Sequence, residues 1–107
     1  MQNRRGRFRK TLEAAVTQQH GGISLVRAAM VAEATLHFSQ VALIDWLLRE
    51  RLKSLTATEI AQMGSRQAFA MGKARTIMAE LLDSETKASG LLQQLQEQFE
   101  ANQGGSQ

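Results

Sequence analysis

Apolar residues recur every three or four positions along most of this chain, which is the spacing of amphipathic helices. The first such segment ends at the Gly21-Gly22 pair, because glycine readily takes the left-handed conformation that closes a helix. Its apolar positions are Phe8, Leu12, Ala15 and Val16. The pattern predicts a short helix that ends near His20.

The segment 23–53 carries the longest helical pattern, and it has two apolar stripes. The first stripe consists of Ile23, Val26, Met30, Ala34, His37, Val41, Ile44 and Leu48. The second stripe consists of Leu25, Ala29, Ala32, Leu36, Leu43 and Leu47. Together they give an apolar arc wider than that of an ordinary surface helix, so we expect a central core helix or a dimer interface. The pattern leaves open whether this helix is continuous or breaks near Ser39.

Two shorter helices are expected next, joined at Gly64. Thr56 and Glu59 have the spacing of a capping box, in which each side chain binds the backbone N–H of the other residue. Gly64 is expected to end this helix and Ser65 to cap the following one. The polar segment 83–90 is expected to be a loop or a frayed joint, after which a last helix starts at Leu91. If the joint stays helical instead, one coiled-coil-like stripe runs through Ile77, Leu81, Ser84, Ala88, Leu91 and Leu95.

These elements predict an all-α protein, a bundle of four to five helices that forms a dimer. The chain has 107 residues and no proline, and it is rich in residues that favour helix. This length suits one small domain. We expect a flexible basic arm at 1–10, a single helical domain at 11–101 and a flexible tail at 102–107.

Positive charge is concentrated at the start of the chain. The first ten residues hold five bases and no acid, whereas the remainder holds eight bases and ten acids. Arginine pairs well with phosphate, so the arm is a candidate nucleic-acid contact. A solvated N-terminus, an anionic membrane and an acidic protein surface are the alternatives. The candidate residues are Arg4, Arg5, Arg7, Arg9 and Lys10.

The segment 55–82 resembles a helix-turn-helix in outline. It has a Thr cap, the sequence EIA, a glycine at the turn and a basic second helix. The resemblance implies that the second helix reads base edges and contacts phosphates through Arg66, Gln67, Lys73 and Arg75. The segment departs from the motif by one missing residue before the turn and by Gly72 within the second helix. A plain helical hairpin is the alternative.

A second candidate surface is an oligomer or partner interface on the long helix. The segment has more apolar surface than one or two short helices cover, and Met and Phe are common at adaptable interfaces. The candidate residues are Met30, Phe38, Val41, Ile44, Trp46 and Leu48. The alternative is that these residues form the core of a single chain.

Enzymatic, metal and membrane functions find little support in the sequence. Glu33 and His37 lie one turn apart, but zinc sites need three or four ligands, so a hydrogen-bonded histidine is expected instead. There is no cysteine and no phosphate-binding glycine loop. Charged residues interrupt the apolar segment 23–48, which disfavours a membrane span. We expect a cytoplasmic protein that is not an enzyme and has no cofactor.

These observations favour a small helical DNA-binding protein, a homodimeric regulator or accessory factor. The arm would supply affinity through phosphates and the hairpin would supply position. Duplex DNA is favoured over RNA because no aromatic platform is evident. The alternative is a helical adaptor or regulatory subunit that binds another protein through its apolar helix face.

Overall fold

The computed structural model describes the backbone of residues 3–105 and the side chains of residues 6–97. In this part of the chain there are four α-helices, a short 3-10 turn and no strand, which confirms the all-α class. The elements are α1 (Asn3–His20), α2 (Leu25–Glu50), η1 (Leu52–Ser54), α3 (Ala57–Leu82) and α4 (Glu85–Gly105).

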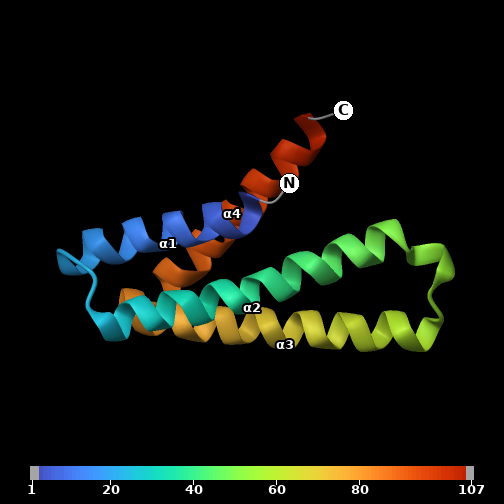
Figure 1. Ribbon diagram of the computed structural model, residues 1–107, viewed down its shortest axis with the longest axis horizontal. Coiled ribbons are helices and arrows are strands. Elements are labelled where there is room, and N and C mark those ends of the chain that lie inside the picture. Colours follow the sequence, from blue (N-terminus) through green and yellow to red (C-terminus); the bar gives the residue numbers. More distant parts are fainter. Residues whose placement is uncertain (1–2, 106–107) are drawn as a thin grey trace.

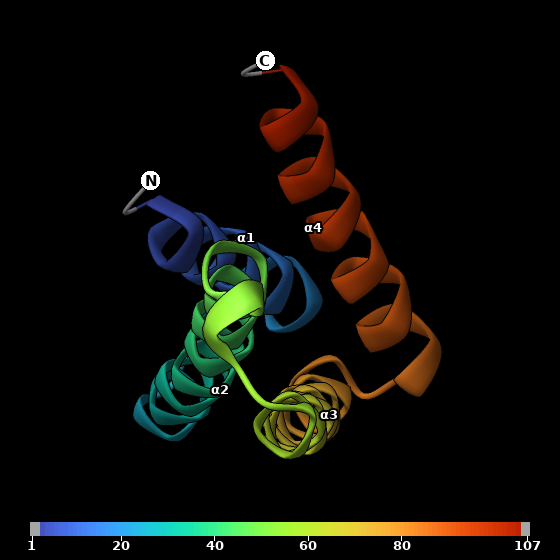
Figure 2. The ribbon, with the colours of Figure 1, turned by 90° about the vertical axis from the view of Figure 1, so that its right-hand side faces the viewer.

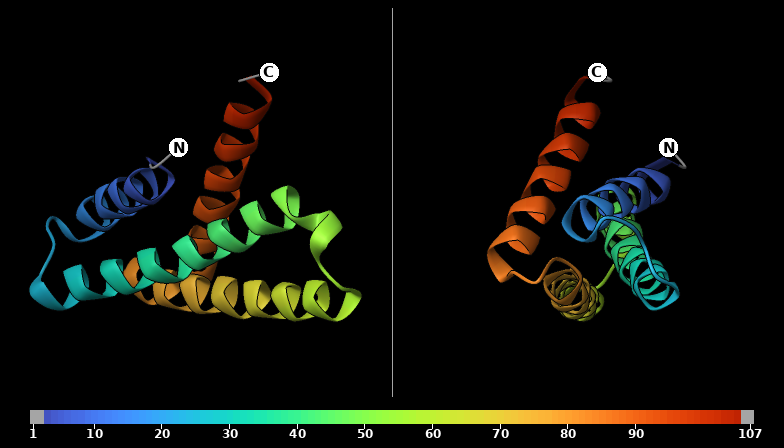
Figure 3. Two further views of the ribbon diagram at one scale, coloured as in Figure 1. Left: turned by 45° about the vertical axis from the view of Figure 1, so that its right-hand side comes forward. Right: turned by 90° about the vertical axis from the view of Figure 1, so that its left-hand side faces the viewer.

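The helices are arranged around one long hairpin. α2 and α3 run antiparallel and are joined through η1 (Figure 1). α1 runs back along α2, and α4 leaves the end of α3 and rises beside α1 (Figure 2). Both cover the half of the hairpin that holds the start of α2, so the half next to η1 projects beyond them (Figure 3).

The hydrophobic core lies where α1 and α4 cover the hairpin. Phe8 of α1 is fully buried and stacks on Phe38 of α2, with ring centroids 4.2 Å apart and planes 10° from parallel. All four helices contribute to this core. Its other members are Leu12, Val16, Val31, Ala34, Met78, Leu81, Leu82, Ala88, Leu92 and Leu95.

Residues 3–10 form the first turns of α1, where the sequence predicted a separate flexible arm. Phe8 explains the difference, because it lies on the same helical stripe as Leu12 and Val16. Burying a side chain of this size stabilises the fold by about 1.5–3 kcal/mol. The basic segment is therefore fixed to the core by its own aromatic residue.

α2 is a single continuous helix. The hydroxyl of Ser24 caps its start by accepting from the Arg27 backbone N–H at 3.2 Å. At Ser39, where the sequence left a break open, the hydroxyl donates to the Thr35 carbonyl at 2.8 Å and the helix continues. α2 ends at Glu50, three residues before the predicted end, and η1 follows.

α3 is also continuous, so the predicted turn at Gly64 and the helix-turn-helix hairpin are wrong. The predicted capping box is confirmed: the Glu59 N–H donates to Thr56 Oγ1 at 3.1 Å, and the Thr56 N–H donates to Glu59 Oε1 at 2.9 Å. Glycine inside a helix costs only about 1 kcal/mol relative to alanine. Packing of α3 along α2 outweighs this cost, and Gly64 keeps a negative φ.

The predicted loop at 83–90 is reduced to two residues, Asp83 and Ser84. Asp83 adopts the left-handed conformation with φ of 54°, which glycine usually supplies and which aspartate tolerates better than most residues. The Ser84 hydroxyl then accepts from the Lys87 N–H at 3.1 Å and starts α4. α4 runs to Gly105, so the described part of the predicted tail 102–107 is helical.

The continuity of α3 predicts that Gly64→Ala raises the free energy of unfolding by about 1 kcal/mol. A Cβ atom at this position would meet no atom within 4 Å. Urea unfolding followed by circular dichroism measures the change. Gly21→Ala is the control and should destabilise, because Gly21 has a φ of 80°. Destabilisation by Gly64→Ala would instead indicate a turn there.

Candidate interaction surface

One of the two apolar stripes of α2 is left uncovered by the fold. Leu25 is 90% exposed, Leu36 is 50% exposed and Leu43 is 57% exposed. Exposed apolar surface of this kind can serve as an interaction site, so the stripe is the candidate surface of this chain. We call this stripe the α2 apolar face, and it consists of Leu25, Ala29, Ala32, Leu36, Leu43 and Leu47.

The α2 apolar face continues into a hollow between α2 and α3. The hollow has a volume of about 460 Å³, and its lining is mostly apolar. Phe69 of α3 forms one wall and is 67% exposed, and the Lys73 ammonium lies 5.3 Å from the centre of its ring. The lining residues are Gln40, Leu43, Ile44, Ser65, Arg66 and Phe69.

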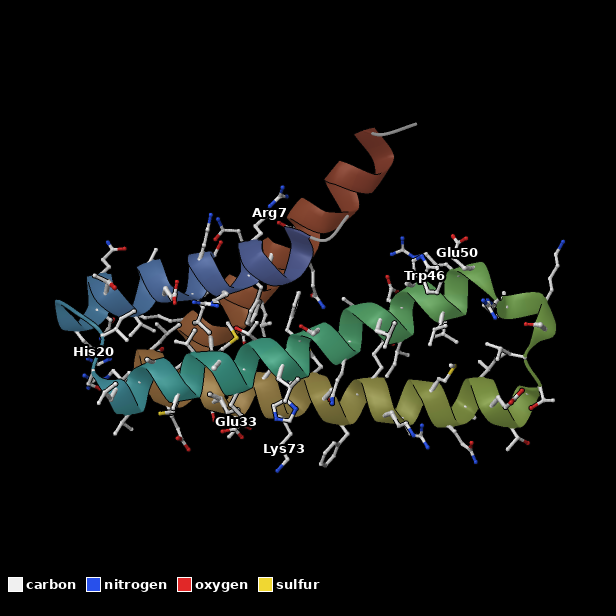
Figure 4. All side chains as sticks on the ribbon, viewed as in Figure 1. Arg7, His20, Glu33, Trp46, Glu50 and Lys73 are labelled. Carbon is white, nitrogen blue, oxygen red and sulfur yellow. The ribbon has the colours of Figure 1, made fainter. Side chains whose placement is uncertain are left out.

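The hollow lies between residues 40–44 of α2 and residues 65–69 of α3. The half of the hairpin next to η1 projects beyond α1 and α4 (Figure 3). The two helices are held together at this point by the Gln67 side-chain amide, which donates to the Val41 carbonyl at 3.1 Å. The walls of the hollow are therefore positioned by the hairpin itself. Figure 4 shows Glu33 and Lys73 directed away from α1, whereas Arg7 and Trp46 are on the opposite side.

Three of the six predicted interface residues are buried or packed against the core of this chain. Phe38 and Val41 are buried at 3% and 8% exposure, and Met30 packs against the core. For these three residues the fold favours the alternative, in which they form the core of a single chain, because this side of α2 faces α1 and α3. Ile44 lines the hollow, and Leu48 is half-buried.

Trp46 is 49% exposed but does not belong to the α2 apolar face. It lies near the end of α2 on the side that α1 covers elsewhere (Figure 4). Ten residues separate it from Leu36, which places it about 80° away around the helix. A partner on the α2 apolar face would contact Trp46 at its edge only.

The predicted DNA-reading residues of α3 do not share one face. Arg66 and Lys73 are seven residues apart, so they project from the same side, next to the hollow. Gln67 is directed inward to the Val41 carbonyl. Arg75 follows Lys73 by two residues and so lies on roughly the opposite side of the helix. Of the four predicted residues, only Arg66 and Lys73 therefore project from one side of α3.

The basic residues of α1 are exposed where the structure describes them. Arg7, Arg9 and Lys10 all reach solvent, and Arg9 Nε lies 3.3 Å from Glu13 Oε2. The side chains of Arg4 and Arg5 lie outside the described residues, although their backbone belongs to α1. The first turns of α1 therefore present positive charge from a folded helix.

The two histidines lie close to polar groups of the fold. His37 Nε2 lies 3.9 Å from Glu33 Oε2, and its Nδ1 is buried without a hydrogen-bond partner. His20 Nε2 lies 2.7 Å from the Leu81 carbonyl, which can only accept, so this nitrogen carries the proton. The bond ties the end of α1 to the end of α3. Among the described residues, no group of three or more His, Cys, Asp or Glu could hold a metal ion.

Neither the family nor the function of the chain is indicated by known proteins. No protein family matches it, and neither a curated protein nor a solved structure does. Within the described residues, no helix combines the length and the apolar character needed to cross a bilayer. The function must therefore be inferred from the surfaces of the molecule.

The exposure of Phe69 predicts that Phe69→Ala changes the free energy of unfolding by less than about 1 kcal/mol, as is usual for surface positions. Phe38→Ala, which opens a cavity under Phe8, should cost about 3–5 kcal/mol. Urea unfolding of both variants measures the difference. A large destabilisation by Phe69→Ala would mean that this ring makes contacts that stabilise the fold and is not a free surface for a partner.

Proposed function

We propose that this chain is a helical protein-binding module, an adaptor or regulatory subunit. The observation that carries the proposal is the uncovered α2 apolar face with the hollow beside it. Leucine and phenylalanine side chains remain exposed along a folded helical hairpin, although the same chain builds a well-covered core nearby. Such a surface is typical of a site that is covered by another protein.

The shape of the surface favours a helix as the bound element. The α2 apolar face extends from Leu25 to Leu47, which corresponds to about 33 Å along the helix. A small molecule would occupy only the hollow, whereas an amphipathic helix would cover the full stripe. Its apolar residues would recur every three or four positions, and one of them would enter the hollow next to Phe69.

Basic residues beside the hollow indicate which charge the partner helix should carry. Arg66 lines the hollow and Lys73 lies beside Phe69 on the same side of α3. Opposite charges across an interface increase the rate of association and fix the register. The partner helix should therefore carry acidic residues on the flank that lies over α3.

Site-specific photocrosslinking tests the proposal. With Phe69 replaced by p-benzoylphenylalanine, irradiation in an extract of the source organism should give a discrete protein adduct, identified by mass spectrometry. The replacement is tolerated because this side chain is largely exposed. Leu43→Asp introduced in the same chain should reduce the adduct, since it places a charge on the α2 apolar face.

Leu52 supplies the matched control. It is 52% exposed but lies in η1, outside the α2 apolar face. The photoreactive residue at position 52 should give no equivalent adduct, and Leu52→Asp should leave the position 69 adduct unchanged. Equal adducts from positions 52 and 69, or none from position 69, would contradict a specific docking site.

Nucleic-acid binding through α1 is the second candidate function. The exposed basic side chains of α1 belong to a helix that the buried Phe8 attaches to the core. A cationic surface of this kind binds phosphates without reading sequence. With no recognition helix in the described residues, such binding would be electrostatic. The predicted specific regulator is replaced here by a non-specific contact with duplex DNA.

Charge removal without truncation tests this second candidate. Arg7→Gln combined with Lys10→Gln should weaken binding to a short random duplex, as measured by fluorescence anisotropy. The slope of log K against log salt should become shallower by about 0.9 for each phosphate that the variant no longer neutralises. Arg51→Gln with Lys53→Gln, which removes two exposed bases near η1, is the control. Equal effects from both pairs would exclude a specific role for α1.

A further inference from the structure

We propose that the helix bound by the α2 apolar face is α2 of a second copy of this chain, packed antiparallel about a two-fold axis at Leu36. The proposal rests on the proposed function, because it assumes that this face binds a helix. It goes further by naming the partner and its register. The observations that carry it are the symmetry of the α2 apolar face, the position of the hollow and the charges beside it.

The α2 apolar face is symmetric about Leu36. Leu25 and Leu47 each lie eleven residues from Leu36, one on each side. Ala29 and Leu43 each lie seven residues from it. In an antiparallel pair, positions equidistant from the axis oppose one another. Every residue of the face except Ala32 therefore meets another residue of the same face, as a two-fold interface requires.

Side-chain size also fits the antiparallel register. Ala29 would oppose Leu43 of the second copy, so a small residue meets a large one on both sides of the axis. Alternation of this kind lets facing helices interdigitate at close range. In a parallel pair Leu43 would meet Leu43 and Ala29 would meet Ala29, which gives crowding at one level and a gap at another.

The hollow faces a part of the second copy that carries small side chains. Gln40, Leu43 and Ile44 contribute the α2 side of the hollow and lie four to eight residues after Leu36. The positions at the same distances before Leu36 are Ala32, Ala29 and Ala28, so the second copy presents small side chains to the hollow. Val26, which is two residues further and 71% exposed, lies level with Trp46 in this register. Small side chains at these positions let the second α2 approach the hollow closely.

Charges at the rim match in the same register. Glu33 and Gln40 are seven residues apart and project from the same side of α2. Because they lie three and four residues from Leu36, Glu33 of the second copy would lie within one residue of the level of Gln40, near Arg66 in the wall of the hollow. The Glu33 side chain is 61% exposed in the single chain. A parallel pair would instead bring the two Glu33 carboxylates together.

Single-cysteine variants test the register, since the chain has no cysteine of its own. Leu36→Cys lies on the proposed axis, so oxidised glutathione should convert it to a disulfide-linked dimer. Leu25→Cys alone should link poorly, because its two copies lie at opposite ends of the interface. A mixture of Leu25→Cys and Leu47→Cys chains should link to each other. Efficient linkage of Leu25→Cys to itself would overturn the antiparallel register.

Sedimentation equilibrium tests the association itself. The wild-type chain of 11.8 kDa should sediment at twice this mass. Leu36→Asp, checked by circular dichroism for intact helix content, should raise the dimer dissociation constant at least about tenfold. Leu43→Asp is the second variant in case the first does not fold. Leu52→Asp, which changes an exposed leucine outside the face, should leave the constant unchanged.

The outcomes separate this inference from the proposed function. A wild-type chain that stays monomeric at submillimolar concentration, or a dimer unaffected by both Leu36→Asp and Leu43→Asp, would overturn the second copy as occupant. If the photoreactive residue at position 69 still captures a different protein, the protein-binding module stands without the dimer. If dimerisation fails and no adduct forms, both are wrong.

Discussion

The structure depends on the excess of apolar surface on α2. This helix carries two apolar stripes, and the described part of the chain has three other α-helices with which to cover them. α1 and α3 pack on the side of α2 that carries the buried residues Val31, Phe38 and Val41, opposite Leu36. Within the described residues, no helix covers the stripe through Leu36 and Leu43. Small domains bury a limited share of their surface, so association is the available way to cover the rest.

The sequence was sufficient to predict those elements whose conformation depends on neighbouring residues. The capping box at Thr56, the stop at Gly21 and the apolar stripe of Phe8 depend on residues within one or two turns. The prediction of a helix break at Gly64 was wrong, because the stabilisation from packing α3 along α2 exceeds the small free-energy cost of glycine in a helix. The short turn at Asp83 was missed because it uses a left-handed aspartate, where sequence rules expect glycine. In both places a distant or uncommon interaction decides the conformation.

The candidate site was likewise predictable where it depends on local sequence and not where it depends on distant contacts. The sequence identified both stripes of α2 but could not tell which one the rest of the chain would cover, because periodicity places residues on a face without saying what that face meets. Its candidate interface residues included Phe38 and Val41, which the fold buries. Phe69 was not among those candidates. Its role in the hollow depends on the register between α2 and α3, which the bond from Gln67 to the Val41 carbonyl fixes.

The stacking of Phe8 on Phe38 also links the two candidate functions physically. Phe38 follows Leu36 by two residues, so α1 is attached to α2 on the side away from the α2 apolar face. A second copy on that face would leave both α1 helices exposed, on the outer sides of the dimer. Two cationic helices on one particle bind a polyanion more tightly than one, by raising the effective concentration of the second contact. Dimerisation and phosphate binding are therefore compatible. Deleting the basic segment would remove Phe8 from the core as well, so only charge-neutralising substitutions separate the two contributions.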